Sequence, residues 1–346
     1  MELPKIPFFK KYSLIFKAII AGGILGLLYA AITDAGSGYA YLKLLPGTMI
    51  GIFISLIIIT FEKSLNLDKY SFLGTMLFKA VIYSFTILLF LLLFIVIFEE
   101  MLGRLSYQEA VVKYVDDRLF EDFLFSLCAS IFLILFLEIS SLLSSRFFYN
   151  YFTGRYHHPK QEERIFMFVD VKSSTTLAEQ LGDILYSKLL QDLFNDFTDA
   201  ILASRAEVYQ YVGDEIILTW KTSTGLKKER CLYCFYLLKQ CIKNREEYYL
   251  KNYNIVPKFK AGMHMGTAVT TWVGKVKKEI VYHGDLLNTT SRIQCKCNDF
   301  NHDFVVSEAI KEILPKDLSI KYTYQDEILL RGKAKPMKLY TVDFNF

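Results

Sequence analysis

The sequence predicts a membrane domain of four transmembrane helices followed by a soluble α+β domain. Hydrophobic residues make up 53% of the 346 residues and charged residues only 22%, against roughly 45–50% and about 25% in average soluble proteins. Almost every long run is apolar up to Phe148, whereas charges return at ordinary density from Arg155 onward. This asymmetry excludes a single homogeneous globule, a disordered chain and a secreted disulfide scaffold.

Four apolar stretches are long enough to cross the hydrocarbon core of a bilayer, which needs about 20 mainly apolar residues. They are residues 14–33, 44–61, 72–98 and 123–147. Lysine and arginine gather in the N-terminal tail, in the middle loop and beyond the fourth stretch. We therefore expect a multi-pass protein of the inner (cell) membrane with both termini in the cytoplasm, and the lipid bilayer as one partner.

The same pattern divides the chain into three parts. Residues 1–148 form the expected membrane domain, residues 149–163 a cytoplasmic coupling linker, and residues 164–346 the soluble domain. The net charge is only +4, and no cluster of Lys and Arg resembles a nucleic-acid-binding surface. Nucleic acid is therefore not an expected partner.

The soluble part alternates strand and helix patterns. We expect strands at residues 164–171, 207–212, 215–220, within 259–272, at 279–283 and 304–307, and near 322–330 and 338–343, with helices at 175–203, 227–248, 285–296 and 308–313. Strands mixed with helices and hairpins indicate an α+β sandwich whose helices cover one face of a sheet.

The first chemical signal is Asp170, which ends the apolar strand that begins near Arg164. Its position at the end of a buried strand would place the carboxylate on the rim of the sheet, within reach of a cation. Taken alone, an aspartate before a helix is more often an N-cap.

The second signal is Asp214, which follows Gly213 between two apolar strands. Glycine permits a tight turn, so Asp214 would project from the tip of a hairpin; a simple turn aspartate is the alternative. Asp170 and Asp214 together are what Mg²⁺-dependent phosphoryl chemistry requires, because the ion prefers hard oxygen ligands and an incomplete protein cage that substrate phosphates complete.

The third signal is Asn288 and Arg292, which lie four residues apart and so share one face of a predicted helix. An amide and a guanidinium that project together suit a sugar edge and a phosphate. A solvated polar face is the alternative.

These signals occur in the order and approximate spacing seen in one enzyme family. Four motifs carry the likeness: Phe168-Val-Asp-Val-Lys-Ser-Ser-Thr175, Val212-Gly-Asp-Glu215, Gly284-Asp-Leu-Leu-Asn-Thr-Thr-Ser-Arg292 and Leu330-Arg-Gly-Lys333. Over roughly residues 164–342 the chain resembles the class III adenylate/guanylate cyclases, in particular the bacterial membrane-anchored type. The resemblance implies a ferredoxin-like catalytic domain that is active as a head-to-tail homodimer with sites at the subunit interface.

By the same resemblance, Asp170 and Asp214 would bind two Mg²⁺ or Mn²⁺ ions per site, with help from the carbonyl oxygen of Val171. One ion would activate the ribose 3′-hydroxyl for attack on the α-phosphate, and the other would hold the triphosphate as pyrophosphate leaves.

The remaining roles implied by the resemblance fall on three residues. Asn288 would orient the ribose, Arg292 would stabilise charge on the α-phosphoryl group in the transition state, and Lys333 would neutralise the β- and γ-phosphates. The expected reaction is that of a phosphorus–oxygen lyase, which forms a 3′,5′-cyclic nucleotide for second-messenger signalling.

The chain departs from the family where the base is selected. Gln210 stands where adenylate cyclases usually have Lys and guanylate cyclases usually have Glu. Val281 stands where adenylate cyclases usually have Asp or Thr and guanylate cyclases usually have Cys. A glutamine amide both donates and accepts and can read either purine. We favour ATP over GTP because bacterial members are mostly adenylate cyclases.

Two other readings remain open from the sequence. A diguanylate cyclase would share a hairpin carboxylate, but it needs Gly-Gly before the acidic pair and has no counterpart of Asn288 and Arg292. The altered residues Gln210 and Val281 also leave room for a catalytically silent membrane receptor or dimerisation module.

Overall fold

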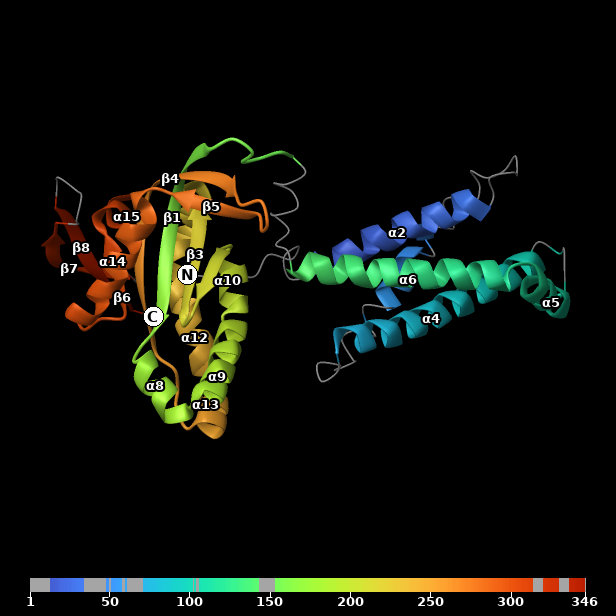
Figure 1. Ribbon diagram of the computed structural model, residues 1–346, viewed down its shortest axis with the longest axis horizontal. Coiled ribbons are helices and arrows are strands. Elements are labelled where there is room, and N and C mark those ends of the chain that lie inside the picture. Colours follow the sequence, from blue (N-terminus) through green and yellow to red (C-terminus); the bar gives the residue numbers. More distant parts are fainter. Residues whose placement is uncertain are drawn as a thin grey trace. The chain divides into compact units, whose positions relative to one another are not determined.

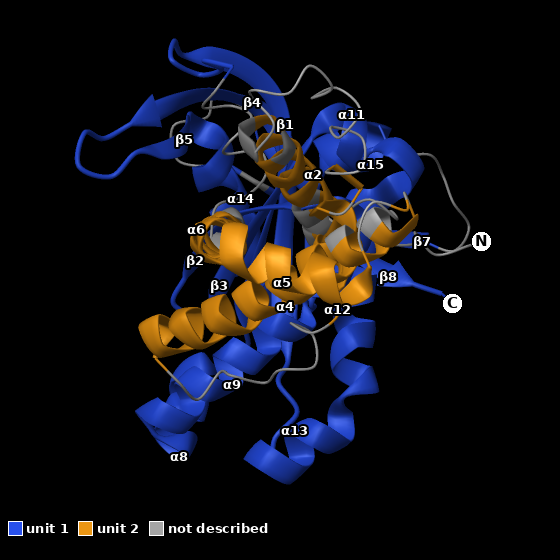
Figure 2. Ribbon diagram, turned by 90° about the vertical axis from the view of Figure 1, so that its right-hand side faces the viewer, with its two compact units in different colours: residues 1–11, 153–346 blue, residues 12–152 orange. Residues whose placement is uncertain are grey.

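The computed structural model describes residues 13–33, 48–49, 51–57, 60, 71–101, 103, 106–142, 153–313, 320–329 and 336–345. The described residues up to 142 belong to one compact unit and those from Thr153 onward to another (Figure 2).

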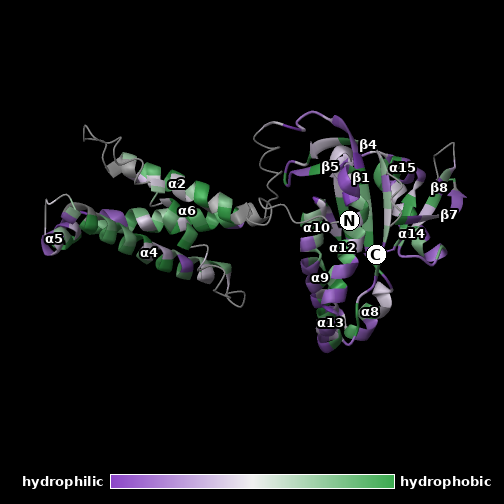
Figure 3. Cartoon of the chain, turned by 180° about the vertical axis from the view of Figure 1, so that it is seen from behind, coloured by the Kyte–Doolittle hydropathy of each residue, from purple (hydrophilic) through white to green (hydrophobic). Residues whose placement is uncertain are grey.

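The first unit consists of apolar helices. They are α2 (Ser13–Thr33), α4 (Phe72–Met101), α5 (Tyr107–Asp117) and α6 (Leu119–Leu142). Hydrophobic residues dominate α2, α4 and α6 in Figure 3. By length and composition, two described segments are able to cross a membrane, namely Phe72–Phe94 and Leu119–Ile139, and a shorter apolar stretch lies at Ile19–Tyr29.

The predicted span at residues 44–61 lies only partly within the described residues. The four-span organisation therefore stays a prediction, supported by two helices of sufficient length. Helices α4 and α6 pack through a small apolar cluster that includes Ala80 and Leu133, and the hydroxyls of Ser84 and Ser126 lie 2.8 Å apart beside it.

The second unit is built on a mixed sheet with strand order β2-β3-β1-β4-β6-β8-β7, and β5 pairs with β4 outside this path (Figure 1). The strands are β1 (Lys160–Val171), β2 (Glu207–Val212), β3 (Glu215–Lys221), β4 (Phe259–Val273), β5 (Glu279–His283), β6 (Phe304–Ser307), β7 (Ile320–Ile328) and β8 (Met337–Phe344). Neighbours are antiparallel except β4 and β6, which are parallel. Strand β1 begins at Lys160, four residues before the predicted start, so the last residues of the expected linker belong to the sheet.

The helices of this unit differ from the predicted ones mainly where the two longest predicted helices are divided. They are α8 (Ser174–Leu181), α9 (Asp183–Asp196), α10 (Thr198–Ser204), α11 (Thr222–Gly225), the 3₁₀ turn η1 (Lys227–Glu229), α12 (Arg230–Asn244), α13 (Glu246–Tyr253), α14 (Asp285–Asp299) and α15 (Glu308–Ile313). The single helix expected at residues 175–203 is interrupted at Gly182, whose φ of 72° is open to glycine without strain, and again at Phe197. The helix expected at residues 227–248 likewise breaks at Arg245.

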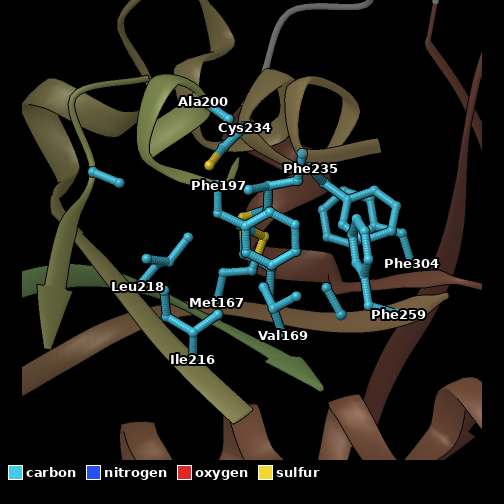
Figure 4. Close-up of a cluster of buried hydrophobic side chains, with 14 of the residues drawn as sticks. Met167, Val169, Phe197, Ala200, Ile216, Leu218, Cys234, Phe235, Phe259 and Phe304 are labelled. Atoms are coloured by element: carbon cyan, nitrogen blue, oxygen red, sulfur yellow. The ribbon is translucent and has the colours of Figure 1, made fainter. Parts of the chain in front are cut away.

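Strand β1 is buried on both faces of the sheet. Its successive side chains point to opposite sides, and each set packs into its own cluster. One set packs into the main core with helices α9, α10 and α12: Ile165, Met167, Val169 and Val171. Figure 4 shows part of this core, with Met167 and Val169 of β1 among side chains such as Phe235 of α12.

The opposite face of β1 packs against α14 and β5. Phe166 and Phe168 form a second cluster with Tyr282 and Leu286. The expectation that helices cover one face only is therefore wrong, because these aromatic side chains need burial as well. Asp170 belongs to the same alternating set as Phe166 and Phe168, which places it on the α14 side of the sheet.

Candidate active site

Three acidic residues are neighbours in the sheet where β1 ends beside the β2–β3 turn. Asp170 pairs in register with Glu215, the first residue of β3, and Asp214 precedes Glu215 in the turn. Gly213 has a φ of 62°, a left-handed conformation that suits glycine and makes the turn tight. Asp170 thus lies near the end of β1 and Asp214 in the β2–β3 turn, where the sequence placed them, and their role as metal ligands stays a prediction.

Asp170 is held by two side chains. The side-chain nitrogen Nε2 of Gln294 donates a hydrogen bond to Asp170 Oδ2 at 2.9 Å, and Lys260 Nζ lies 3.3 Å from the same oxygen. Burial and the neighbouring charge of Asp214 raise the pKa of Asp170, while Lys260 and Gln294 oppose the rise. The carboxylate is therefore oriented through one oxygen.

Asp214 and Glu215 are the acidic neighbours of Asp170 in this site. The Oδ2 atom of Asp214 is buried and has no hydrogen-bond partner among the residues that the structure describes. Burial, followed by the charges of Asp170 and Asp214, raises the pKa of Glu215 to about 7. Burial and neighbouring charge thus destabilise the charged forms of Asp170 and Glu215, which a cation would relieve.

The donor set fits a divalent metal ion that is only partly caged by protein. Across the described parts of the chain, no group of three or more His, Cys, Asp and Glu side chains is arranged to hold a metal ion by itself. Asp170 and Asp214 offer hard carboxylate oxygens, and Val171 follows Asp170 at the end of β1. Mg²⁺ is typically bound in this way, by one or two carboxylates with water and substrate phosphates as further ligands.

Asn288 and Arg292 lie on the first turns of α14, on a different face from Gln294. Asn288 is exposed and Arg292 half-buried, whereas Gln294 belongs to the buried set of the same helix. Because an α-helix turns 3.6 residues per turn, the face that carries residues 288 and 292 points away from the face that brings Gln294 to Asp170. Helical geometry thus directs Asn288 and Arg292 away from the face that contacts Asp170 in the same chain.

Gln210 and Val281 lie on strands on either side of the aromatic cluster. Gln210 follows a bulge at Tyr209 in β2 and is exposed, and Val281 of β5 is half-buried opposite Thr271 of β4. Their sequence neighbours Tyr209 and Tyr282 are in edge-to-face contact, with ring centres 5.0 Å apart. This contact brings the two neighbouring rings together, and the joint reading of a base by Gln210 and Val281 stays a prediction. Lys333 and the rest of its motif, residues 330–333, lie outside the described residues.

Sequence reasoning missed two residues that contact Asp170. Lys260 pairs in register with Asp170 across β1 and β4, and Gln294 reaches it from α14. The spacing of Gln294 two residues after Arg292 places it on another face of the helix, but only the sheet register shows what that face meets.

The chain is similar to known adenylate and guanylate cyclases. Residues 157–343 match the family model of the adenylate and guanylate cyclase catalytic domain. Adenylate cyclase 2 of Rhizobium meliloti (strain 1021) is 30% identical over 201 residues, which cover 58% of this chain and 55% of that protein. Adenylate cyclase 1 of the same organism is 24% identical over 187 residues, which cover 53% of this chain and 28% of that protein. The matched region is thus about half of the first relative's length and less of the second's.

Among solved structures, a bacterial light-regulated adenylyl cyclase aligns with a TM-score of 0.54 at 17% identity, over 62% of this chain and 64% of that chain. At this identity the likeness shows a common fold.

Proposed function

Because the chain belongs to the adenylate and guanylate cyclase family, we propose that it is a membrane-bound adenylate cyclase, a lyase that converts ATP into 3′,5′-cyclic AMP and pyrophosphate. One observation carries the proposal: Asp214 lies close enough to Asp170 for its charge to raise the pKa of that carboxyl, and a buried oxygen of Asp214 has no hydrogen-bond partner among the described residues. Such an oxygen is costly unless a cation or a donor reaches it.

Asp170 and Asp214 would hold two Mg²⁺ or Mn²⁺ ions, with the carbonyl oxygen of Val171 as a further ligand. Bound ions supply Lewis acidity toward the ribose 3′-hydroxyl and charge compensation for the triphosphate. The two carboxylates fix the reacting groups of the nucleotide relative to the chain, so the catalytic contribution of these residues is positioning and electrostatics.

Asn288 and Arg292 would act on the nucleotide held by a second copy of the chain. Their outward face on α14 supports this arrangement, because it points away from Asp170 of the same chain. Asn288 would orient the ribose, Arg292 would stabilise the α-phosphoryl transition state, and Lys333 would neutralise the β- and γ-phosphates. A homodimer would thus contain two complete sites.

The apolar helices would anchor the enzyme in the inner (cell) membrane. Helices α4 and α6 contain the two segments long enough to span a bilayer, and the predicted orientation places the catalytic domain in the cytoplasm, where nucleoside triphosphates occur. ATP is favoured over GTP because both similar proteins of Rhizobium meliloti are adenylate cyclases.

The test is a product assay on the full chain, purified in nanodiscs and incubated with Mn²⁺ and either ATP or GTP. We expect cyclic AMP from ATP. Cyclic GMP alone would overturn the choice of base, cyclic di-GMP would identify a diguanylate cyclase, and no product from either nucleotide would favour a catalytically silent module.

Variants of the same chain test the metal ligands. Asp170→Asn and Asp214→Asn should reduce activity to background. Asp299→Asn is the matched control, because Asp299 is exposed at the end of α14 and pairs with Lys296. Activity that survives in either of the first two variants would show that the metal assignment is wrong.

A further inference from the structure

We propose that Gln294 is a positioning residue for the metal ligand Asp170: its amide fixes the carboxylate through Oδ2 and leaves Oδ1 for the metal ion. This inference rests on the proposed function, because it takes Asp170 as a ligand. The proposed role of Gln294 involves no contact of its own with the metal ion or the nucleotide. It acts through Asp170.

The contact between the two residues is a buried one. Gln294 is only 4% exposed, and its Nε2 donates to Asp170 Oδ2 at 2.9 Å. Lys260 Nζ approaches the same Oδ2 at 3.3 Å. Among the described residues no hydrogen bond reaches Oδ1 of Asp170, so both protein contacts leave that oxygen available.

The backbone beneath Gln294 is fixed by a close approach of α14 to β4. A Cβ atom on Gly262 of β4 would overlap the backbone nitrogen and Cα of Gln294. The Cys297 thiol also contacts the carbonyl oxygen of Ala261 at 3.2 Å, and Lys260 Nζ donates to Asn298 Oδ1 at 3.1 Å. These contacts fix the backbone of Gln294 relative to β4, and from that position its side-chain amide reaches Asp170.

A fixed donor on a metal ligand has a known energetic role. Groups that orient a ligating side chain reduce the reorganisation needed on binding, and their loss typically costs 10–100-fold in metal affinity. We therefore expect Gln294→Met, which keeps the length of the side chain but removes the N–H donor, to weaken Mn²⁺ binding about tenfold or more.

Lys260 should have the opposite effect. Its ammonium group is a like charge for a metal ion bound at Asp170, and like charges a few ångströms apart repel strongly in a partly buried site. We expect Lys260→Met to tighten Mn²⁺ binding about threefold or more. A purely structural role for these residues would not produce changes of opposite sign.

The experiment measures Mn²⁺ binding to the full chain in nanodiscs by the loss of the EPR signal of free Mn²⁺, without nucleotide. Thr290→Val is the matched control, because it removes a buried hydrogen bond from the same helix, to the carbonyl oxygen of Leu286, without touching Asp170. We expect wild-type affinity in this control. A second measurement, cyclase activity against Mn²⁺ concentration, should show a raised half-saturating concentration in Gln294→Met with kcat recovering at saturating metal.

The outcomes distinguish failure of the proposed metal site from failure of the positioning role of Gln294. If Asp170→Asn binds Mn²⁺ as tightly as the wild type, the proposed metal site is wrong. If Asp170→Asn loses binding but Gln294→Met keeps wild-type affinity, the positioning role is wrong. Should Gln294→Met fail to fold, Gln294→Asn serves in its place, because its amide is one methylene too short to reach Oδ2; wild-type affinity in that variant would overturn the role equally.

Discussion

Arg164 and Glu162 form a buried ion pair at the start of the central strand, with Arg164 Nη2 2.9 Å from Glu162 Oε2 and Arg164 only 2% exposed. Glu162 also accepts hydrogen bonds from Tyr156 and Arg155, both at 2.9 Å. The guanidinium carbon of Arg164 lies 5.0 Å from the ring centre of Tyr282 in β5. The start of the second unit is thus tied directly to the aromatic cluster beside the candidate active site.

Removal of Glu162 should destabilise this unit strongly. Glu162→Ala would leave the buried Arg164 charge with its longer contact to Glu207, at 3.3 Å. A buried charge left without any partner typically costs about 3–5 kcal/mol, so we expect a loss at or below the lower end of that range. Urea unfolding followed by tryptophan fluorescence measures this selectively, because both tryptophans of the chain, Trp220 and Trp272, lie in the soluble unit. Lys277→Ala is the control, since this side chain is 83% exposed and its pair with Glu279 lies in solvent. Equal stability of the two variants would contradict a buried ion pair.

The same pair predicts a dependence of stability on pH. Burial alone would raise the pKa of Glu162, but Arg164, Tyr156 and Arg155 together hold it below its ordinary value of 4.5. The folded state therefore binds this proton more weakly than the unfolded chain, so the stabilisation is complete above that value and is lost as the pH falls through the folded-state pKa. The wild type should exceed Glu162→Gln in melting temperature at pH 6, and the gap should narrow toward pH 3. A gap that does not change with pH would refute the assignment.

Local patterns in the sequence predicted the elements of the site but not its internal contacts. The strand that ends at Asp170, the turn at Asp214 and the helix that carries Asn288 and Arg292 all follow from apolar periodicity and turn residues. The contact of Gln294 with Asp170 depends instead on the register of two strands and on an approach of α14 to β4, which involve residues far apart in the chain.

The same limit explains the errors in the helices. Gly182 provided a local signal for a break in the predicted helix at residues 175–203. The sequence carries no such signal at the second break, at Phe197. This residue is buried in the main core and packs there edge-to-face on Phe259 of β4. Tertiary packing, which no local pattern encodes, sets that boundary.

Gly262 should tolerate no side chain. Gly262→Ala would force α14 away from β4, because the added Cβ would overlap backbone atoms of Gln294 that cannot rotate aside. Overpacking of this kind typically costs about 1–3 kcal/mol, and the displaced Gln294 should lower activity as well. Gly266→Ala on the same strand is the control: its Cβ would lie 3.4 Å from Leu286, an ordinary contact. Urea unfolding and the cyclase assay should separate the two variants, and identical behaviour would refute the close approach.

Two inactive variants should restore activity when they are combined. If each site takes its aspartates from one chain and Asn288 and Arg292 from the other, a mixed dimer of Asp170→Asn with Asn288→Ala contains one intact site of two. Random pairing in co-expression makes about half of the dimers mixed, so about a quarter of the wild-type activity is expected. The control pairs Asp170→Asn with Asp214→Asn, which damage the same set of ligands and should not complement. No activity in the first mixture would contradict sites shared between chains.

The choice of base should respond to Gln210 and Val281. The double variant Gln210→Lys with Val281→Asp restores the residues usual in adenylate cyclases and should raise the ratio of kcat/KM for ATP to that for GTP. Gln210→Glu with Val281→Cys should lower it. A charged hydrogen bond to one base that is lost with the other typically changes such a ratio about tenfold or more.

Product assays with both nucleotides give the ratio for each variant, and melting curves confirm that the variants fold. We expect the two positions to act together because the resemblance assigns both to the recognition of one base, and their sequence neighbours Tyr209 and Tyr282 are in ring contact. Each change in the ratio can be expressed as a free energy. If the free-energy change of a double variant equals the sum for its two single variants, the two residues read the base independently. If neither pair changes it, the base is selected elsewhere in the chain.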